Sequence, residues 1–203
     1  MDVFASDHKV AAWIVRVAGL LLPVTLTIQY LILIGVEFFF YMTDWGLVLT
    51  VVVFSLILLR SLYRGFGTAA RLMLPAVWMM NASITVSFWV LTYPLGDFEF
   101  LPCLLAHGPH LVSTSLELLW LDRVKIGWRD IVISLVIQFV YTLGVDLPLT
   151  LIYGQLYPED DFGGILAYIG MAVMVGVTVG TGVLGICFKR HVAKSLEEKA
   201  EFY

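Results

Sequence analysis

Six long apolar stretches follow one another along the chain, and short polar segments separate them. Their approximate bounds are 16–36, 39–59, 72–95, 104–121, 130–153 and 164–188. Each approaches or exceeds the roughly 20 apolar residues that a helix needs to cross a bilayer. Because lipid offers the backbone no hydrogen-bond partner, each stretch is predicted to be a helix. The pattern therefore predicts an all-α, polytopic integral membrane protein, in which residues 1–203 form a single domain of six transmembrane helices.

The composition agrees with a membrane protein and excludes several other classes. Apolar residues make up 60% of the 203 residues, charged residues only 14%, and the mean hydropathy is +0.92. A soluble globular domain is about half apolar and about a quarter charged. The excess of apolar residues excludes a water-soluble domain and a disordered chain. The net charge of −4 leaves no basic surface for a nucleic acid.

The charged residues fix the expected orientation. The 12 basic residues all lie on one side of the predicted spans: Lys9, Arg16, Arg60, Arg64, Arg71, Arg123, Lys125, Arg129, Lys189, Arg190, Lys194 and Lys199. The other side carries acidic residues: Glu37, Asp44, Asp97, Glu99, Glu159, Asp160 and Asp161. Short loops with this asymmetry follow the positive-inside rule. We therefore expect a multi-pass protein of the plasma membrane or the endoplasmic reticulum, with both termini cytoplasmic.

Glycines in the last stretch indicate close helix packing. Gly176 and Gly180 form a G-x-x-x-G pattern, and Gly182 and Gly185 follow it. Small residues at this spacing let two membrane helices approach closely. We therefore expect this helix to pack closely on a neighbour, and a ligand pocket lined by the glycines is the alternative.

Polar residues inside the spans are the candidates for chemistry, because they are costly in lipid. The ionisable ones are Asp44, His107, His110, Glu117 and Asp146, and the uncharged ones are Gln29, Thr43, Asn81 and Gln138. A retinal Schiff base is excluded, since no span carries a central lysine. The common zinc signatures C-x-x-C and H-E-x-x-H are absent from the sequence.

The densest polar cluster runs from residue 106 to residue 117. On a helix, His107 and His110 are i,i+3 neighbours, and Glu117 lies two turns below His110. Three interpretations remain open at this point. The two histidines could bind a metal together with Asp146 or Asp44, one of them could act as a general base, or both could be hydrogen-bonded to hydroxyls in the bundle core.

Depth in the bilayer separates these candidates. At 1.5 Å per helical residue, Thr43 lies about 6 Å, His110 about 9 Å and Asp146 about 10 Å inside the outer boundary. Glu117 lies about 20 Å down by the same count, and we expect a structural pairing with Arg123 or another basic loop residue. Asn81 falls near mid-span, too deep for a donor to an oxyanion in the outer layer. The common outer layer suits a hydrolase, because water and a fatty-acyl chain can both reach it.

Several segments resemble the androgen-induced protein family, which includes the androgen-dependent regulator of tissue factor pathway inhibitor. The segments are Tyr41-Met42-Thr43-Asp44-Trp45-Gly46-Leu47, Phe88-Trp89-Val90-Leu91 with Asp97, His107-Gly108-Pro109-His110 with Glu117, Tyr157-Pro158, and the charged tail 194–199. Members are six-span intramembrane threonine hydrolases that cleave fatty acid esters of hydroxy fatty acids. The resemblance implies that Thr43 is the nucleophile and that His110 is the base.

The sequence thus predicts a membrane-embedded lipid ester hydrolase that needs no cofactor. Its partners would be a lipid ester, the fatty acid product and membrane lipids, and a homo-oligomer is compatible with this interpretation. Asp146 or Asp44 could orient the imidazole, and His107 and Asn81 could line the pocket. The alternatives are a non-catalytic membrane carrier or regulatory protein, and a metal-dependent lipid hydrolase that uses His107, His110 and an aspartate.

Overall fold

The computed structural model describes residues 9–96, 98–121, 124–153 and 165–201, and this part of the chain contains helices and no strand. The elements are α1 (Lys9–Ile34), η1 (Gly35–Phe40), α2 (Met42–Leu59), α3 (Arg64–Ser87), η2 (Phe88–Thr92), α4 (Tyr93–Leu95), α5 (Phe100–His107), α6 (Pro109–Ser115), η3 (Leu116–Leu121), α7 (Trp128–Tyr141), η4 (Thr142–Asp146), α8 (Leu147–Tyr153) and α9 (Ile165–Glu201). Of the η elements, η1 is a 3₁₀ turn, and η2, η3 and η4 are π-helical segments.

Five helices in the described residues are long and apolar enough to cross a membrane: Lys9–Ile34, Met42–Leu59, Arg64–Leu95, Trp128–Ile152 and Ala167–Ala193. They coincide with five of the six predicted stretches, so the prediction of helices long and apolar enough to cross a membrane is confirmed for these five. The sixth stretch, 104–121, is helical as well, but it is divided among α5, α6 and η3.

The division lies at Gly108 and Pro109. Proline has no N–H to donate, and its ring clashes with the preceding turn, so a helix begins more easily than it continues at this residue. Two backbone hydrogen bonds span the break, from Gly108 N to Leu104 O at 2.9 Å and from Val112 N to Gly108 O at 3.1 Å. The segment therefore changes direction locally without losing its helical course.

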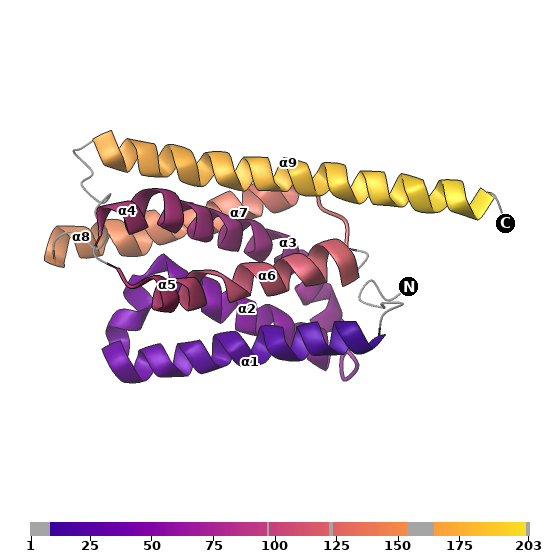
Figure 1. Ribbon diagram of the computed structural model, residues 1–203, viewed down its shortest axis with the longest axis horizontal. Helices are drawn as coiled ribbons and strands as arrows, with labels where there is room; N and C mark the ends of the chain where they lie inside the picture. Colours follow the sequence, from indigo (N-terminus) through magenta and orange to yellow (C-terminus); the bar gives the residue numbers. More distant parts are fainter. Residues whose placement is uncertain (1–8, 97, 122–123, 154–164, 202–203) are drawn as a thin grey trace.

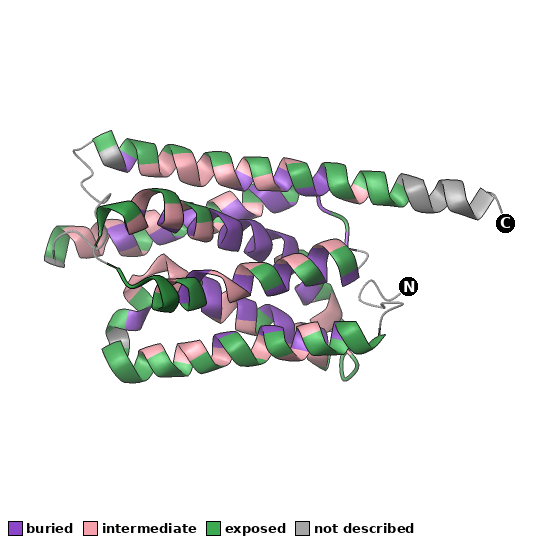
Figure 2. Cartoon of the chain, viewed as in Figure 1, coloured by how far each residue is buried: buried purple, intermediate pink, exposed green. Residues whose placement is uncertain are grey.

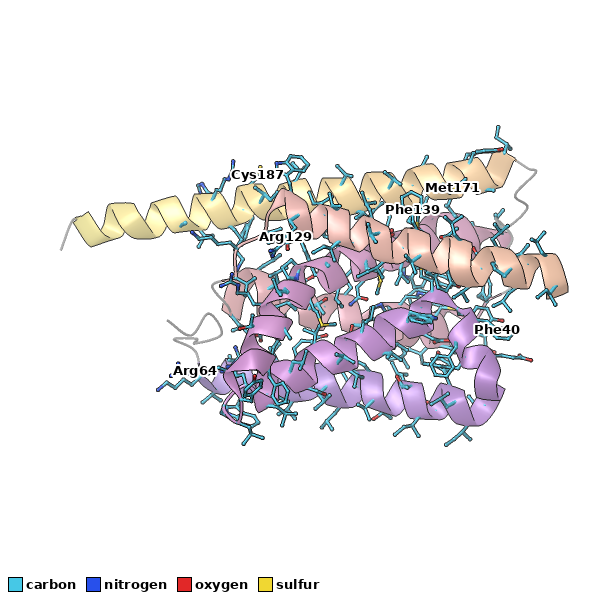
Figure 3. The ribbon with its side chains drawn as sticks, turned by 180° about the vertical axis from the view of Figure 1, so that it is seen from behind. Phe40, Arg64, Arg129, Phe139, Met171 and Cys187 are labelled. Carbon is cyan, nitrogen blue, oxygen red and sulfur yellow. The ribbon has the colours of Figure 1, made fainter. Side chains whose placement is uncertain are left out.

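The helices run lengthwise beside one another (Figure 1). The start of α1 and the end of α9 lie toward one end, whereas η1, α4 and α8 lie toward the other. In Figure 3 the side chains of Arg64 and Arg129 lie toward one end of the bundle, and the side chain of Phe40 lies near the opposite end. The two ends of the bundle thus differ in charge, as the sequence predicts.

The core forms around α3, which packs against α2, α6, α7 and α9. Of the five long apolar helices, α3 is the most buried and α1 the least. Phe54, Leu74, Met79 and Leu118 are fully buried members of the core. The outward faces of α1 and α9 are largely exposed (Figure 2), and many of their side chains are apolar, including Trp13, Ile32 and Leu184. An exposed apolar face of this kind is what a helix presents to lipid.

Only part of the glycine pattern in α9 serves helix packing. A Cβ at Gly185 would lie 2.7 Å from Ile126 Cδ1 and 2.8 Å from Trp78 Cζ3, and one at Gly182 would lie 2.7 Å from Met79 Sδ. At Gly176 and Gly180 nothing lies within 4 Å. The expected close packing is thus found at Gly182 and Gly185 and not at the G-x-x-x-G pair itself, because Gly182 lies about 200° around the helix from Gly180 at 100° per residue.

Candidate active site

His110 occupies the first turn of α6, and its side chain is fully buried, at 0% exposure. Neither ring nitrogen has a hydrogen-bond partner. Its backbone oxygen, in contrast, accepts hydrogen bonds from Thr114 Oγ1 at 2.7 Å, Ser113 Oγ at 3.2 Å and Asn81 Nδ2 at 3.5 Å. The main chain at His110 is therefore held firmly, while the imidazole keeps a donor and an acceptor for another molecule.

Asn81 connects three helices at the level of His110. Its Nδ2 donates to Thr50 Oγ1 at 2.9 Å and to the His110 oxygen, and Thr50 Oγ1 donates to Gly46 O at 2.7 Å. The sequence predicts that Asn81 lies deeper than the layer that holds His110, but its amide reaches the His110 backbone oxygen, so the two residues lie at one level of the bundle. The helical segment that leads to His110 begins at Phe100, earlier than the predicted stretch.

Thr43 is the second residue of α2 and is half-buried. Residues three and seven positions apart share a helix face, so Thr43 lies on the side of α2 where Gly46 and Thr50 meet Asn81. The backbone of Tyr41 is extended, and the helix begins directly after it. Asp44 follows Thr43, and its side chain is 5% exposed. Thr43 thus lies about one turn before Gly46 and two turns before Thr50 along α2.

The start of α2 is tied to η1 and α7. Trp45 Nε1 donates to Phe39 O at 2.9 Å, and the Tyr141 hydroxyl donates to Phe40 O. The Trp45 and Tyr141 rings meet edge to face with centroids 6.5 Å apart. These contacts fix the segment that carries Thr43 against the helix that leads to Asp146.

Asp146 is buried at the end of η4, and its Oδ1 accepts a 3.5 Å hydrogen bond from Thr150 Oγ1. The structure does not join Asp146 or Asp44 to the His110 ring, since both ring nitrogens lack partners. Neither aspartate orients the imidazole by a direct hydrogen bond in this conformation.

His107 is held in a different way from His110. Its ring stacks on Phe88, with centroids 3.6 Å apart and planes 11° apart, and its backbone oxygen accepts from Thr85 Oγ1 at 2.7 Å. The ring is 7% exposed, and its Nδ1 has no partner. His107 thus lies in α5 with its ring packed on Phe88. His110 lies in α6, beyond the break at Gly108.

Glu117 forms a buried ion pair with Arg16. Arg16 Nε lies 2.9 and 3.0 Å from the two carboxylate oxygens, and Nη2 lies 2.6 Å from Oε1. The predicted pairing with a basic residue is confirmed, but the expected kind of partner, a loop residue, is wrong. Arg123 lies outside the described residues, and Arg16 lies inside α1 because that helix begins at Lys9.

The other polar candidates lie away from this cluster. Gln138 is fully buried and bonded to Thr178 Oγ1 at 2.9 Å and Ser134 Oγ at 3.1 Å, which joins α7 to α9. Gln29 is exposed on α1. The sequence analysis missed Thr50 and Gly46, although their positions seven and three residues after Thr43 were a usable signal. Within the described residues, no group of three or more His, Cys, Asp or Glu side chains gathers to hold a metal ion.

Comparisons with known proteins identify no relative. No family model matches the chain, and neither the curated proteins nor the solved structures contain a significant match.

Proposed function

We propose that this chain is a membrane-embedded lipid ester hydrolase that cleaves fatty acid esters of hydroxy fatty acids. Thr43 would be the nucleophile and His110 the general base, as the resemblance to the androgen-induced protein family implies. The observation that carries the proposal is the His110 ring, which is fully buried with both nitrogens lacking partners. A buried polar group left unpaired costs about 1–3 kcal/mol, and such costs are typical of functional sites.

Helix geometry supports a pairing of Thr43 with His110. α2 and α6 both begin toward the end of the bundle where η1 lies (Figure 1). Helical side chains lean toward the helix N-terminus, whereas backbone carbonyls point toward the C-terminus. The His110 oxygen is level with Asn81, so its ring extends from there toward the level of Thr43.

The proposed reaction has two steps. His110 removes the Thr43 hydroxyl proton as the oxygen attacks the ester carbonyl, and the same proton then passes to the departing alcohol. Water next attacks the acyl-threonine with His110 again as the base, which releases the fatty acid and restores Thr43. The apolar surroundings suit the acyl chains, and the chemistry requires no cofactor.

The proposal includes six membrane crossings with both termini in the cytoplasm. Five apolar helices support five of them, and the broken segment α5–α6–η3 would supply the sixth. Gly108 keeps helical backbone angles, with φ −93° and ψ −55°, so this segment would cross as one helix interrupted at Pro109, which has no N–H to donate.

The pairing of polar groups farther along the bundle favours a one-sided pocket over a carrier's path. Ser113 and Thr114 donate to carbonyls of their own helix, and Arg16 holds Glu117. A carrier would present available polar groups at successive depths.

Intact mass spectrometry after treatment with a fluorophosphonate probe tests the proposal. We expect one adduct, which maps to Thr43 and disappears in His110→Ala. An adduct on Ser113, Thr114 or Ser115 would overturn the assignment of the nucleophile, and a hydrolytically active protein that never reacts would overturn the mechanism.

A further inference from the structure

The buried core extends to the end of the bundle where α3 and α7 begin. Its members there come from three elements: Ala70 of α3, Val124 and Ile126 of the segment before α7, and Ile186 of α9. A Cβ on Gly185 would lie 2.7 Å from Ile126 Cδ1, so α9 packs directly on that segment. Apolar packing therefore holds three stretches that are far apart in the sequence together at this end.

Exposed basic residues accompany each of these buried positions. Arg71 follows the core member in α3, Lys125 lies between the two core members before α7, and Arg190 comes one turn after the core member in α9. Arg129, in the first turn of α7, is a fourth. Figure 3 shows Arg129 and Cys187, which lies one turn before Arg190, on the same face of the bundle, and α7 contacts α9. We call these four basic residues the basic rim.

The acidic side chains that the structure describes at this end leave the basic rim largely uncompensated. Glu117 is fully buried and is paired with Arg16. Asp130 is 4% exposed, and its ion-pair contact is Arg129 Nη2, at 3.5 Å. The other three members of the rim form no ion pair with a carboxylate in the described part of the chain. The rim is therefore a surface of exposed positive charge.

Exposed tryptophans indicate that the basic rim lies at the depth of lipid headgroups. Trp128, directly before Arg129, is 63% exposed, and Trp120 at the end of η3 is 74% exposed. In membrane proteins, indole rings concentrate at the boundary between hydrocarbon and water. Long basic side chains near this boundary keep their stems in apolar surroundings while their charged ends reach the headgroups. Lipid phosphates are thus the anions that the rim meets first.

We propose that the basic rim binds an anionic phospholipid, which in the proposed orientation belongs to the cytoplasmic leaflet. An anionic headgroup supplies the negative charge that the described acidic side chains do not, whereas a zwitterionic headgroup carries no net charge. Three of the four rim residues are arginines, whose planar guanidinium groups can hold a phosphate through two parallel hydrogen bonds. The surface uses neither Thr43 nor His110, so it does not depend on the proposed hydrolysis.

Two double variants with the same change of charge separate the rim from the net charge of the protein. Arg71→Gln with Lys125→Gln removes one arginine and one lysine of the rim. Arg64→Gln with Lys9→Gln removes the same two residue types at the starts of α3 and α1, outside the rim. All four native side chains are exposed, so neither double variant leaves a buried charge without a partner. Equal Tm values in detergent without added lipid confirm that both fold.

The experiment is native mass spectrometry of the full chain in detergent micelles that contain equal amounts of phosphatidylserine and phosphatidylcholine. We expect the wild-type protein to retain phosphatidylserine in preference to phosphatidylcholine. The rim variant should lower this preference about fivefold for each residue changed, the factor that one basic residue near an anionic surface contributes. The matched control should keep most of the preference. Higher salt should weaken it in the wild-type protein, because the charges on both sides are exposed.

Three results would overturn the assignment. One is equal retention of the two lipids by the wild-type protein, and another is an equal loss of preference in the two double variants. The third is displacement of the lipid by an equal concentration of glycerophosphoserine, which would assign the rim to a soluble phosphate ester. Thr43→Ala should retain phosphatidylserine as the wild-type protein does, whether or not it hydrolyses esters. A failure of the proposed hydrolase function therefore leaves this test of the rim unchanged.

Discussion

Arg16 and Glu117 form a buried ion pair across the bundle, with Arg16 Nε 2.9 and 3.0 Å from the two carboxylate oxygens. The pair joins α1 to the segment that carries His110, about one turn beyond Ser113. α1 is the least buried of the long apolar helices. It packs mainly on α2, and the ion pair adds a buried polar contact to η3.

Removing one charge of this pair should destabilise the fold and spare the chemistry. Glu117→Gln removes the carboxylate from a buried ion pair, and breaking such a pair costs about 3–5 kcal/mol. We expect a lower Tm in detergent and lower expression, with turnover per folded molecule within a few-fold of wild type. The double variant Arg16→Met, Glu117→Leu should recover most of the stability, because an apolar pair is often neutral or better. A well-folded Glu117→Gln protein that loses roughly 10²-fold in turnover would place Glu117 in the catalytic machinery instead.

The apolar stretches predicted the long helices because lipid leaves the backbone no other structure. The same criterion did not reveal the break in residues 104–121. An apolar segment that holds Gly108 and Pro109 can form either a proline-initiated helix or a kinked one, and packing against α3 decides between them. Depth counting had the same weakness, because it did not reveal that the Asn81 amide reaches the His110 backbone oxygen.

Contacts between distant residues could not be predicted from the sequence. The bond from Asn81 to Thr50 joins residues 31 positions apart, and the pair of Arg16 and Glu117 joins residues 101 positions apart. Both depend on how the helices rotate about their axes. Residue type and approximate depth indicated which side chains need a partner, and the fold decides which partner each one finds.

The two faces of α9 should differ in their tolerance of added volume. Gly185→Ala brings a Cβ within 2.8 Å of the Trp78 ring, and we expect a loss of about 1–3 kcal/mol, as for other overpacked cores. Gly180→Ala adds a methyl group in open space and should be neutral or stabilise by up to about 1 kcal/mol through lower backbone entropy. Thermal unfolding of the two variants in one detergent compares them directly. Equal losses would mean that both glycines face a neighbour.

Cysteine accessibility should report the proposed orientation. In a protein with Cys103 and Cys187 replaced by serine, a membrane-impermeant maleimide should label Arg64→Cys only from the cytoplasmic side and Phe98→Cys only from the opposite side. Both native side chains are exposed. Labelling of Phe98→Cys from the cytoplasmic side would refute the proposed orientation. It would also refute the number of membrane crossings proposed between the N-terminus and residue 98.

His107 should matter less for turnover than His110. Its ring stacks on Phe88 at 3.6 Å, so His107→Phe keeps an aromatic surface while removing both nitrogens. We expect this variant to fold and to retain turnover within about tenfold of wild type, since loss of a general base usually costs 10²-fold or more. His107→Ala, which also loses the stacking, serves as the comparison for stability. If His107→Phe is as inactive as His110→Ala, the first histidine takes part in the chemistry.

The most direct test of the account is the rate at which purified variants in nanodiscs hydrolyse the palmitoyl ester of hydroxystearic acid. Thr43→Ala and His110→Ala should each fold and lose detectable turnover, and Thr43→Ser should keep a part of it because the hydroxyl remains. The double variant should be little worse than either single one, because members of a catalytic unit are strongly non-additive. A folded Thr43→Ala protein that hydrolyses the ester at the wild-type rate would contradict the account.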